Sequence, residues 1–241
     1  MTAAPPAPVD RSLYTRAVVL GAGGNGGRDA RALAVRLAAP GAEILSCASD
    51  DPRLAAARTD ADLIVLARKG DRSAAGTAPR DILSLLHGCA QPVAVAPPGY
   101  AARAAPISRI AVAVDGGPDS LIAARHAAAL RDEVHGTLVP VCVVNPLVAL
   151  APWGGTPVVE ADPRPLSPQT AEQLHALGAG PLRILRGLTG AELCEFAAGV
   201  DLLVCGSRRR DALHRVVLGS TSEYLVRHLA FPLLITPAAG P

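Results

Sequence analysis

The sequence predicts an α/β fold in which two doubly wound parallel-sheet domains follow each other in tandem. Apolar runs of strand length alternate with Ala-rich segments of helical period, which is typical of parallel βαβ units. Residues 61–99 and 200–240 also repeat one order of features: an Asp-led apolar strand, a basic turn, a helical segment, a proline and a short apolar strand. We therefore expect domains at 14–99 and 108–238, joined near Tyr100–Ser108.

The second half contains the full series of predicted elements. Its expected strands are short apolar runs at Ile110–Val114, Thr137–Val144, Leu182–Leu185, Asp201–Cys205 and Leu233–Thr236. Its expected helices lie at 119–132, 169–177, 189–198 and 220–228. Asp119 or Ser120 is expected to cap the first helix and Thr189 the third, because side-chain oxygens accept hydrogen bonds from free N–H groups. The proline-rich segment 145–168 is either a lid over a ligand or a surface loop.

The first half is shorter by one strand and one helix. Its expected elements are strands at 16–21, 44–47, 63–66 and 92–96, a glycine-rich turn with an Ala-rich helix, and a short helix at 52–58. The closing strands of the two halves, Pro92–Ala96 and Pro232–Thr236, are the candidates for pairing with each other, since an edge strand must be covered or paired.

Composition excludes several classes of function. Lys69 is the only lysine and lies outside any Gly-Lys-[Ser/Thr] context, so a phosphate-binding loop of that type and a Tyr-x-x-x-Lys reductase pair are ruled out. Aromatic residues make up 2% of the chain and the net charge is +2, so we expect no nucleic-acid partner. No apolar run predicts a signal peptide or membrane span, and the five dispersed cysteines predict free thiols, so we expect a cytoplasmic protein.

No catalytic or metal-binding constellation is recognisable. The histidines share no ligand spacing, and no serine lies in a Gly-x-Ser-x-Gly elbow. Cys205, at the end of a predicted strand, either faces the ligand crevice or is a buried structural thiol. We therefore expect binding rather than enzymatic turnover, with no metal.

Glycine and hydroxyl residues gather at the predicted carboxyl ends of the second-half strands. Asp115-Gly116-Gly117 follows the first strand. Gly206-Ser207-Arg208-Arg209 follows the fourth, and nine residues later Gly219-Ser220 opens a helix. Open parallel sheets bind ligands beyond these strand ends, glycine lets the backbone approach phosphate, and a helix N-terminus attracts anions.

This pattern resembles the Gly-x2-Gly-x9-Gly-[Ser/Thr] nucleotide motif of the universal stress protein family, which has an adenine nucleotide alpha hydrolase-like fold. The resemblance covers residues 108–237 well and 14–98 weakly, so the chain resembles a tandem member with a degenerate first domain. It implies a five-stranded parallel sheet, pairing of two such sheets within one chain or in a homodimer, a regulatory role in stress response, and ATP or a related adenine nucleotide as ligand.

The resemblance assigns ligand-binding roles to strand ends and to the start of the last helix. The acid Asp115 would contact the ribose side, and the backbone of Val143 and Val144 would lie near the base. The complete candidate set is Asp115, Gly116, Gly117, Val143, Val144, Gly206, Ser207, Arg208, Arg209, Gly219, Ser220, Thr221 and Ser222. Asp115 could instead only cap a turn, and Ser220 could cap its helix with or without a bound phosphate.

One position departs from the family motif. Arg209 stands where the motif has its second glycine, and a side chain there hinders close approach of backbone to phosphate. The Arg208–Arg210 run either compensates by pairing with phosphate or is a solvated basic turn. If Arg209 abolishes binding, the chain is an interaction module that has lost its nucleotide.

The first half carries a second glycine-rich turn. Gly21-Ala22-Gly23-Gly24-Asn25-Gly26 matches Gly-x-Gly-x-x-Gly after a predicted strand, and Asp50 lies near the place of a ribose-binding acid. This pattern favours an alternative function, an NAD(P)-binding enzyme that uses the first half. Against that alternative, the first half offers only four strands, and no acid corresponds to Asp115.

Overall fold

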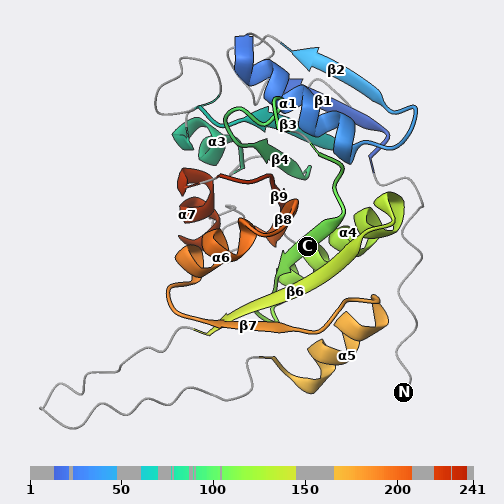
Figure 1. Ribbon diagram of the computed structural model, residues 1–241, viewed down its shortest axis with the longest axis vertical. Coiled ribbons are helices and arrows are strands. Elements are labelled where there is room, and N and C mark those ends of the chain that lie inside the picture. Colours follow the sequence, from blue (N-terminus) through green and yellow to red (C-terminus); the bar gives the residue numbers. More distant parts are fainter. Residues whose placement is uncertain are drawn as a thin grey trace, which may run out of the picture.

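The computed structural model describes residues 14–21, 24–47, 61–69, 77, 79–86, 89, 91–103, 105–144, 166–207, 220–228 and 230–237. Their strands form one nine-stranded sheet in the order β2-β1-β3-β4-β9-β8-β5-β6-β7 (Figure 1). The first half contributes β1 (Arg16–Leu20), α1 (Gly24–Leu37), β2 (Glu43–Cys47), β3 (Leu63–Ala67), α3 (Pro79–Leu86) and β4 (Val93–Ala96). The second contributes β5 (Arg109–Ala113), α4 (Pro118–Val134), β6 (Thr137–Val144), α5 (Pro168–Ala176), β7 (Arg183–Arg186), α6 (Thr189–Ala197), β8 (Leu202–Gly206), α7 (Ser220–His228) and β9 (Leu233–Thr236).

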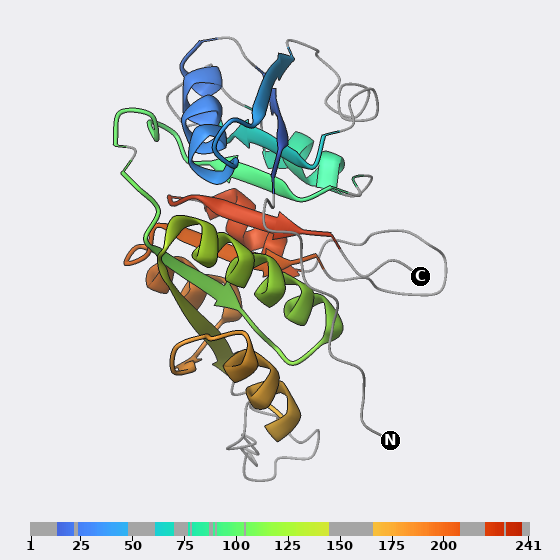
Figure 2. The ribbon, with the colours of Figure 1, turned by 90° about the vertical axis from the view of Figure 1, so that its right-hand side faces the viewer.

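Helices cover both faces of this sheet. One apolar cluster joins the strands to α1, α4 and α5, which lie one above another on the face turned to the viewer in Figure 2. A second cluster, on the opposite face, joins the strands to α3, α6 and α7. Successive strand residues such as Val18 and Val19 belong to opposite clusters, because side chains alternate across a strand. Burial on both faces explains why the strands are continuous apolar runs without alternation.

The α/β fold with parallel strands is confirmed, and the described strands and helices lie within about two residues of the predicted bounds. In the second half, strand order β9-β8-β5-β6-β7 is that of a doubly wound sheet. The first half has β2-β1-β3-β4, without a counterpart of β7 among the described residues. The helix predicted at 52–58 and most of the proline-rich segment, residues 145–165, lie outside the described residues.

The two halves meet through their closing strands. β4 and β9 pair antiparallel, with Val93 opposite Ile235 and Val95 opposite Leu233, whereas every other pair of named strands is parallel. These are the two strands that the sequence singles out as pairing candidates. Because α1 and α4 lie on one face while the strand directions reverse, a rotation about an axis perpendicular to the sheet relates the two halves.

The same hydrogen-bond arrangement secures the start of the first strand in each half. In the first half, Asp62 accepts from the Thr15 N–H (2.6 Å), the Thr15 hydroxyl (2.8 Å) and the Arg16 N–H (3.0 Å). In the second, Asp201 accepts from the Ser108 N–H and hydroxyl (both 2.9 Å) and the Arg109 N–H (2.8 Å). Each aspartate thus ties the start of one strand to the start of its neighbour, at equivalent positions of the two halves.

Two predicted helix caps are wrong. The N-cap of α4 is Gly117, with Pro118 in the first turn, so Asp119 and Ser120 lie inside the helix. Proline suits this place because its missing N–H is one that no helical carbonyl would have accepted. The N-cap of α6 is Leu188 rather than Thr189, and no side chain caps it.

Candidate functional site

The candidate site lies at the carboxyl ends of β8, β5 and β6, which are neighbours in the sheet. Because parallel strands end at the same edge, this order brings the segments after β5 and β8 together although they are about ninety residues apart in the chain. Asp115 follows β5, Val143 and Val144 end β6, and Gly206 ends β8. This is the arrangement expected for those residues.

Asp115 is exposed and held in a tight turn. Its Oδ1 accepts a hydrogen bond from the Gly117 N–H at 2.9 Å. Ser120 closes the turn, since its hydroxyl donates to the Gly117 carbonyl at 2.8 Å and accepts from the Asp115 N–H at 3.3 Å. Gly116 has φ +83°, in the left-handed region that glycine adopts most readily. The turn therefore fixes the carboxylate at the sheet edge in a defined orientation.

Two residues beside this turn carry no sequence signal. A Cβ atom on Gly116 would lie 3.7 Å from both Leu166 Cδ2 and Thr170 Oγ1, so the start of α5 packs directly against the turn. Thr170 is buried and its hydroxyl lies 3.0 Å from that of Ser167, the N-cap of α5. Neither residue belongs to the glycine-serine pattern, and only the fold brings them next to Asp115.

Gly206 marks the point where β8 touches the first turn of α4. A Cβ atom there would lie 2.6 Å from the Asp119 carbonyl oxygen, a distance that backbone cannot accommodate without moving. The absence of a side chain therefore lets the strand end approach the helix. The next residue, Ser207, donates its N–H to the Thr236 carbonyl at 2.9 Å.

The Ser207 hydroxyl is a buried polar group with an open hydrogen-bonding capacity. Its side chain is 3% exposed, and Oγ has no hydrogen-bond partner within the part of the chain that the structure describes. A buried hydroxyl without a partner is unfavourable by roughly 1–3 kcal/mol, so the Ser207 hydroxyl points to an interaction with a group outside the described residues.

The first turn of α7 closes the site from the other side. Ser220 is exposed, Thr221 is half-buried, and the buried Ser222 donates its hydroxyl to the Gly206 carbonyl at 3.4 Å. The structure therefore brings Gly206, Ser207 and Ser222 together. It does not place three other candidates, Arg208, Arg209 and Gly219, which lie outside the described residues.

Two cysteines border the site, and both are held as thiols. Burial raises the pKa of Cys205 to about 12, although a weak contact with the Ser222 hydroxyl at 3.9 Å acts in the opposite direction. Burial also raises the pKa of Cys142, and the negative charge of Asp115 adds to that rise. Neither group is a nucleophile at neutral pH. All five cysteines are free, as the sequence predicts.

The glycine-rich pattern of the first half, Gly21–Gly26, follows β1 as predicted, and its last three residues begin α1. Gly21 has φ +70°, whereas Ala22, Gly23 and Asp50 lie outside the described residues. A cavity of about 480 Å³ opens beside the first turns of α1, lined by Asn25, Gly26, Arg28, Asp29, Pro98, Gly99, Ala101 and Ala102. Asp29 accepts from the N–H groups of Gly99 and Ala101 (both 2.8 Å), which fixes the turn after β4 against the helix.

The described residues offer no cluster of three or more His, Cys, Asp and Glu side chains suited to a metal ion. Across the same residues, every helix is too short or too polar to cross a membrane.

The fold and the site together define a class: a doubly wound α/β protein with an acid-glycine turn after the first strand of its complete half and a Gly-Ser segment after the fourth. The profile of the universal stress protein family matches residues 106–237. The chain therefore belongs to the universal stress protein family, as its motif indicates.

Relatives agree with this assignment. Universal stress protein MJ0531 of Methanocaldococcus jannaschii is 25% identical over 136 residues, which are 53% of this chain and 80% of the relative. A putative universal stress protein from Pseudomonas aeruginosa UCBPP-PA14 has a structure that aligns over 95% of both chains, at 17% identity and a TM-score of 0.58. A universal stress protein from Archaeoglobus fulgidus aligns over 83% of this chain and 73% of its own, at 19% identity and a TM-score of 0.56. These two structures support the fold of the chain.

Proposed function

We propose that this protein is a regulatory stress-response protein whose second half binds ATP or a related adenine nucleotide. The observation that carries the proposal is the buried Ser207 hydroxyl, which has no partner among the described residues and follows the glycine that brings β8 against α4. A phosphate oxygen would satisfy that hydroxyl. The start of α7, next in space, supplies free N–H groups and a positive dipole end that favour an anion.

The other candidates have complementary roles in this proposal. The Asp115 carboxylate would accept hydrogen bonds from ribose hydroxyls, and the ends of β6 at Val143 and Val144 would lie along the base. Ser220 and Thr221 would donate to phosphate, and Arg208 and Arg209 would add guanidinium groups that pair with it. We expect binding without turnover, because the sequence offers no base, nucleophile or metal site for a reaction.

The first half has a supporting role in the same proposal. We infer that it is a reduced copy of the second, because Asp62 and Asp201 make equivalent hydrogen bonds at equivalent strand starts. Its closing strand β4 covers the edge of β9, which an isolated second half would leave open. The tandem arrangement thus provides within one chain the pairing that the family resemblance implies, and a homodimer is not required for it.

Calorimetric titration of the full chain with ATP tests the nucleotide proposal. We expect binding that weakens at least tenfold in Asp115→Ala and in Ser207→Ala, since a hydrogen bond to a charged group contributes about 1.5–3 kcal/mol. Asp132→Ala is the matched control: it removes an exposed aspartate from the opposite end of α4 and should leave ATP affinity unchanged. Equal loss in all three variants would indicate general destabilisation and count against the proposed site.

The same titration distinguishes two other functions. Arg209, in place of the motif glycine, favours an interaction module that has lost its nucleotide, and this function predicts no heat with ATP or NADPH. An NAD(P)-dependent function of the first half is favoured by the cavity beside Gly26. It predicts NADPH binding that Gly23→Val abolishes and Asp115→Ala leaves unchanged.

A further inference from the structure

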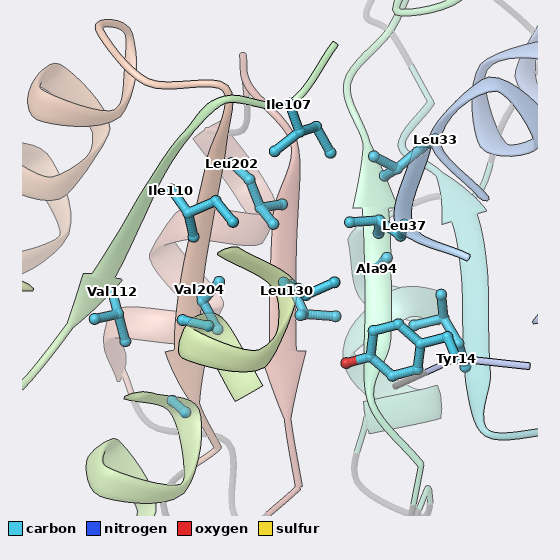
Figure 3. Close-up of a cluster of buried hydrophobic side chains, with 14 of the residues drawn as sticks. Tyr14, Leu33, Leu37, Ala94, Ile107, Ile110, Val112, Leu130, Leu202 and Val204 are labelled. Carbon is cyan, nitrogen blue, oxygen red and sulfur yellow. The ribbon is translucent and has the colours of Figure 1, made fainter. Parts of the chain in front are cut away.

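Helix α4 presents one face to the first half of the chain. His126, Leu130 and Glu133 are spaced by four and three residues, so they lie along one stripe of the helix. Leu130 is 1% exposed and shares an apolar cluster with Tyr14, Leu33 and Leu37 of the first half. Figure 3 shows these side chains facing one another across the paired strands β4 and β9, with the Tyr14 hydroxyl directed toward the second half.

Tyr14 and His126 form a direct polar contact across this junction. The Tyr14 hydroxyl oxygen lies 3.4 Å from His126 Nδ1, and the two rings are stacked with centroids 6.5 Å apart and planes inclined by 20°. Tyr14 is 1% exposed, just before β1, while His126 is half-buried in the middle of α4. The contact therefore joins residues 112 positions apart in the chain, one from each half.

The protonation state of each partner follows from its surroundings. Burial raises the pKa of Tyr14 far above neutral pH, and the carboxylates of Asp62 and Glu133 raise it further, so the phenol keeps its proton. In its neutral form with the ring proton on Nε2, His126 offers Nδ1 as the acceptor for this phenol proton. Burial lowers the pKa of His126, which favours this neutral form.

Two other titratable groups lie along this stripe of α4, each seven residues from His126: Asp119 and, toward Tyr14, Glu133. The Glu133 Oε2 is buried without a hydrogen-bond partner among the described residues, and burial raises the pKa of Glu133. The first half contributes Tyr14 itself and Asp62, which holds the backbone of Thr15 and Arg16, and Tyr100 is a further titratable group in the same apolar cluster. Because the His126 ring is partly withdrawn from water, a proton added to it would be poorly solvated.

We propose that the contact between Tyr14 and His126 is a pH-sensitive latch between the two halves: neutral imidazole holds the Tyr14 hydroxyl, and protonation in mild acid removes the acceptor and loosens α4 from the first half. The latch acts on the junction and not on the nucleotide site, so it stands independently of the proposed function.

The direction of the pH effect follows from linkage. A histidine with a lowered pKa in the folded state stabilises the fold fully above its unfolded value near 6.5. That stabilisation is lost as the pH falls from there through the lowered value. Glu133 acts in the opposite sense, because a carboxyl with a raised pKa becomes less unfavourable as the pH falls. The test must therefore separate the two groups.

NMR titration of the full chain measures the latch directly. We expect the His126 ring to titrate below 6.5, and Tyr14→Phe, which removes only the donor, to raise that value by a few tenths of a unit or more. Glu133→Gln is the companion variant that isolates the carboxyl. A His126 ring that titrates at or above 6.5, or a value unmoved in Tyr14→Phe, would overturn the proposal.

Hydrogen exchange of α4 amides reports the loosening itself. After correction for intrinsic rates, we expect protection around residues 126–130 to fall at least threefold between pH 7.5 and 5.5, and His126→Phe to remove this fall. His135→Asn, at the exposed C-cap of α4, is the control that should behave as the unmodified chain, because asparagine tolerates the φ of +52° at this position. If His126→Phe keeps the fall, the latch is refuted. If that variant does not fold, Tyr14→Phe decides, since a fall that persists unchanged without the hydroxyl also refutes it.

Discussion

The two halves of the chain are alike at the amino-terminal ends of their strands and differ at the carboxyl-terminal ends. At the amino edge, Asp62 and Asp201 bind the start of β1 and β5 through equivalent hydrogen bonds. At the carboxyl edge, only the second half has an acid in its first turn and a Gly-Ser segment after its fourth strand. Features that build the sheet are thus present twice, whereas this ligand-binding pattern is present once. The contrast agrees with our proposal that the second half holds the nucleotide site.

The largest expected effect tests whether the two halves unfold as one unit. Leu33 of α1 and Leu130 of α4 are both fully buried in the same cluster. Leu33→Ala and Leu130→Ala should each lower the free energy of unfolding by about 2–5 kcal/mol, because each leaves a cavity. Urea unfolding followed by circular dichroism should show one transition, displaced alike in both variants. Two separate unfolding transitions, each shifted by only one of the variants, would show that the two halves unfold independently and would contradict this prediction.

The ends of β3 and β8 offer a sharper contrast. Ala67 and Gly206 occupy equivalent places, and Gly206 lies against the backbone of the first helix of its own half, at Asp119. Gly206→Ala should destabilise the fold by about 1–3 kcal/mol through overpacking. The reciprocal Ala67→Gly should lower stability by about 1 kcal/mol through loss of a buried methyl and added chain freedom. Thermal unfolding measures both effects. If Gly206→Ala is as stable as the parent, the Asp119 backbone can move to accommodate the added methyl group at little energetic cost.

The paired aspartates give a smaller effect that should be nearly equal in the two halves. Asp62→Asn and Asp201→Asn each weaken three hydrogen bonds to a carboxylate, for which we expect about 1–2 kcal/mol. Loss of stability in only one variant would show that the shared hydrogen bonds do not have a shared energetic role.

Asp201 also has a defined pH dependence. Burial alone would raise its pKa, but hydrogen bonds from Arg109 and Ser108 and the charge of Arg109 outweigh burial and lower it. Its stabilisation is therefore complete above the usual value of 3.8 and is lost as the pH falls through the lowered value. Acid unfolding between pH 5 and 2 should be shallower in Asp201→Asn than in the parent. If stability falls between pH 5 and 2 as steeply in Asp201→Asn as in the parent, other carboxyl groups are responsible for the acid sensitivity.

The smallest effect concerns an exposed ion pair of α7. Arg227 contacts Glu223 one helical turn away, with N–O distances of 3.1 and 2.7 Å. Glu223→Gln should lower stability by only about 0.3–0.5 kcal/mol, and 1 M salt should abolish the difference. A larger or salt-resistant effect, measured by urea unfolding, would mean that this helix has partners beyond the pair.

Much of the fold could be predicted because buried parallel strands are continuous apolar runs. The run Leu63–Ala67 is recognisable without any structure. The predicted caps of α4 and α6 were wrong because hydroxyl and carboxylate residues also occur inside the first turn, where an acid favours the helix dipole. For α4, Pro118 was the better signal of the helix start.

The sequence predicted the candidate site residues that directly follow strands or begin a helix, because the order of the strands in the sheet brings these positions together. Gly206 and Ser222 are in contact and Asp115 lies at the same edge of the sheet, whereas Leu166 and Thr170 reach the Asp115 turn through packing of α5, which has no local signal. Similarly, the leading aspartates of β3 and β8 are visible in the sequence, but their partners Thr15 and Ser108 are 47 and 93 residues away.

The antiparallel pairing of β4 with β9 has a consequence for synthesis on the ribosome. Val93 is matched with Ile235, so β4 emerges long before its partner strand exists. At about 5–20 residues per second, the interval of about 142 residues corresponds to roughly 7–28 s. During that time the nascent first half exposes an open, apolar strand edge, the kind of surface that promotes aggregation and chaperone binding. Strand β9, synthesised long after β4, is therefore the strand that covers the open edge of the first half.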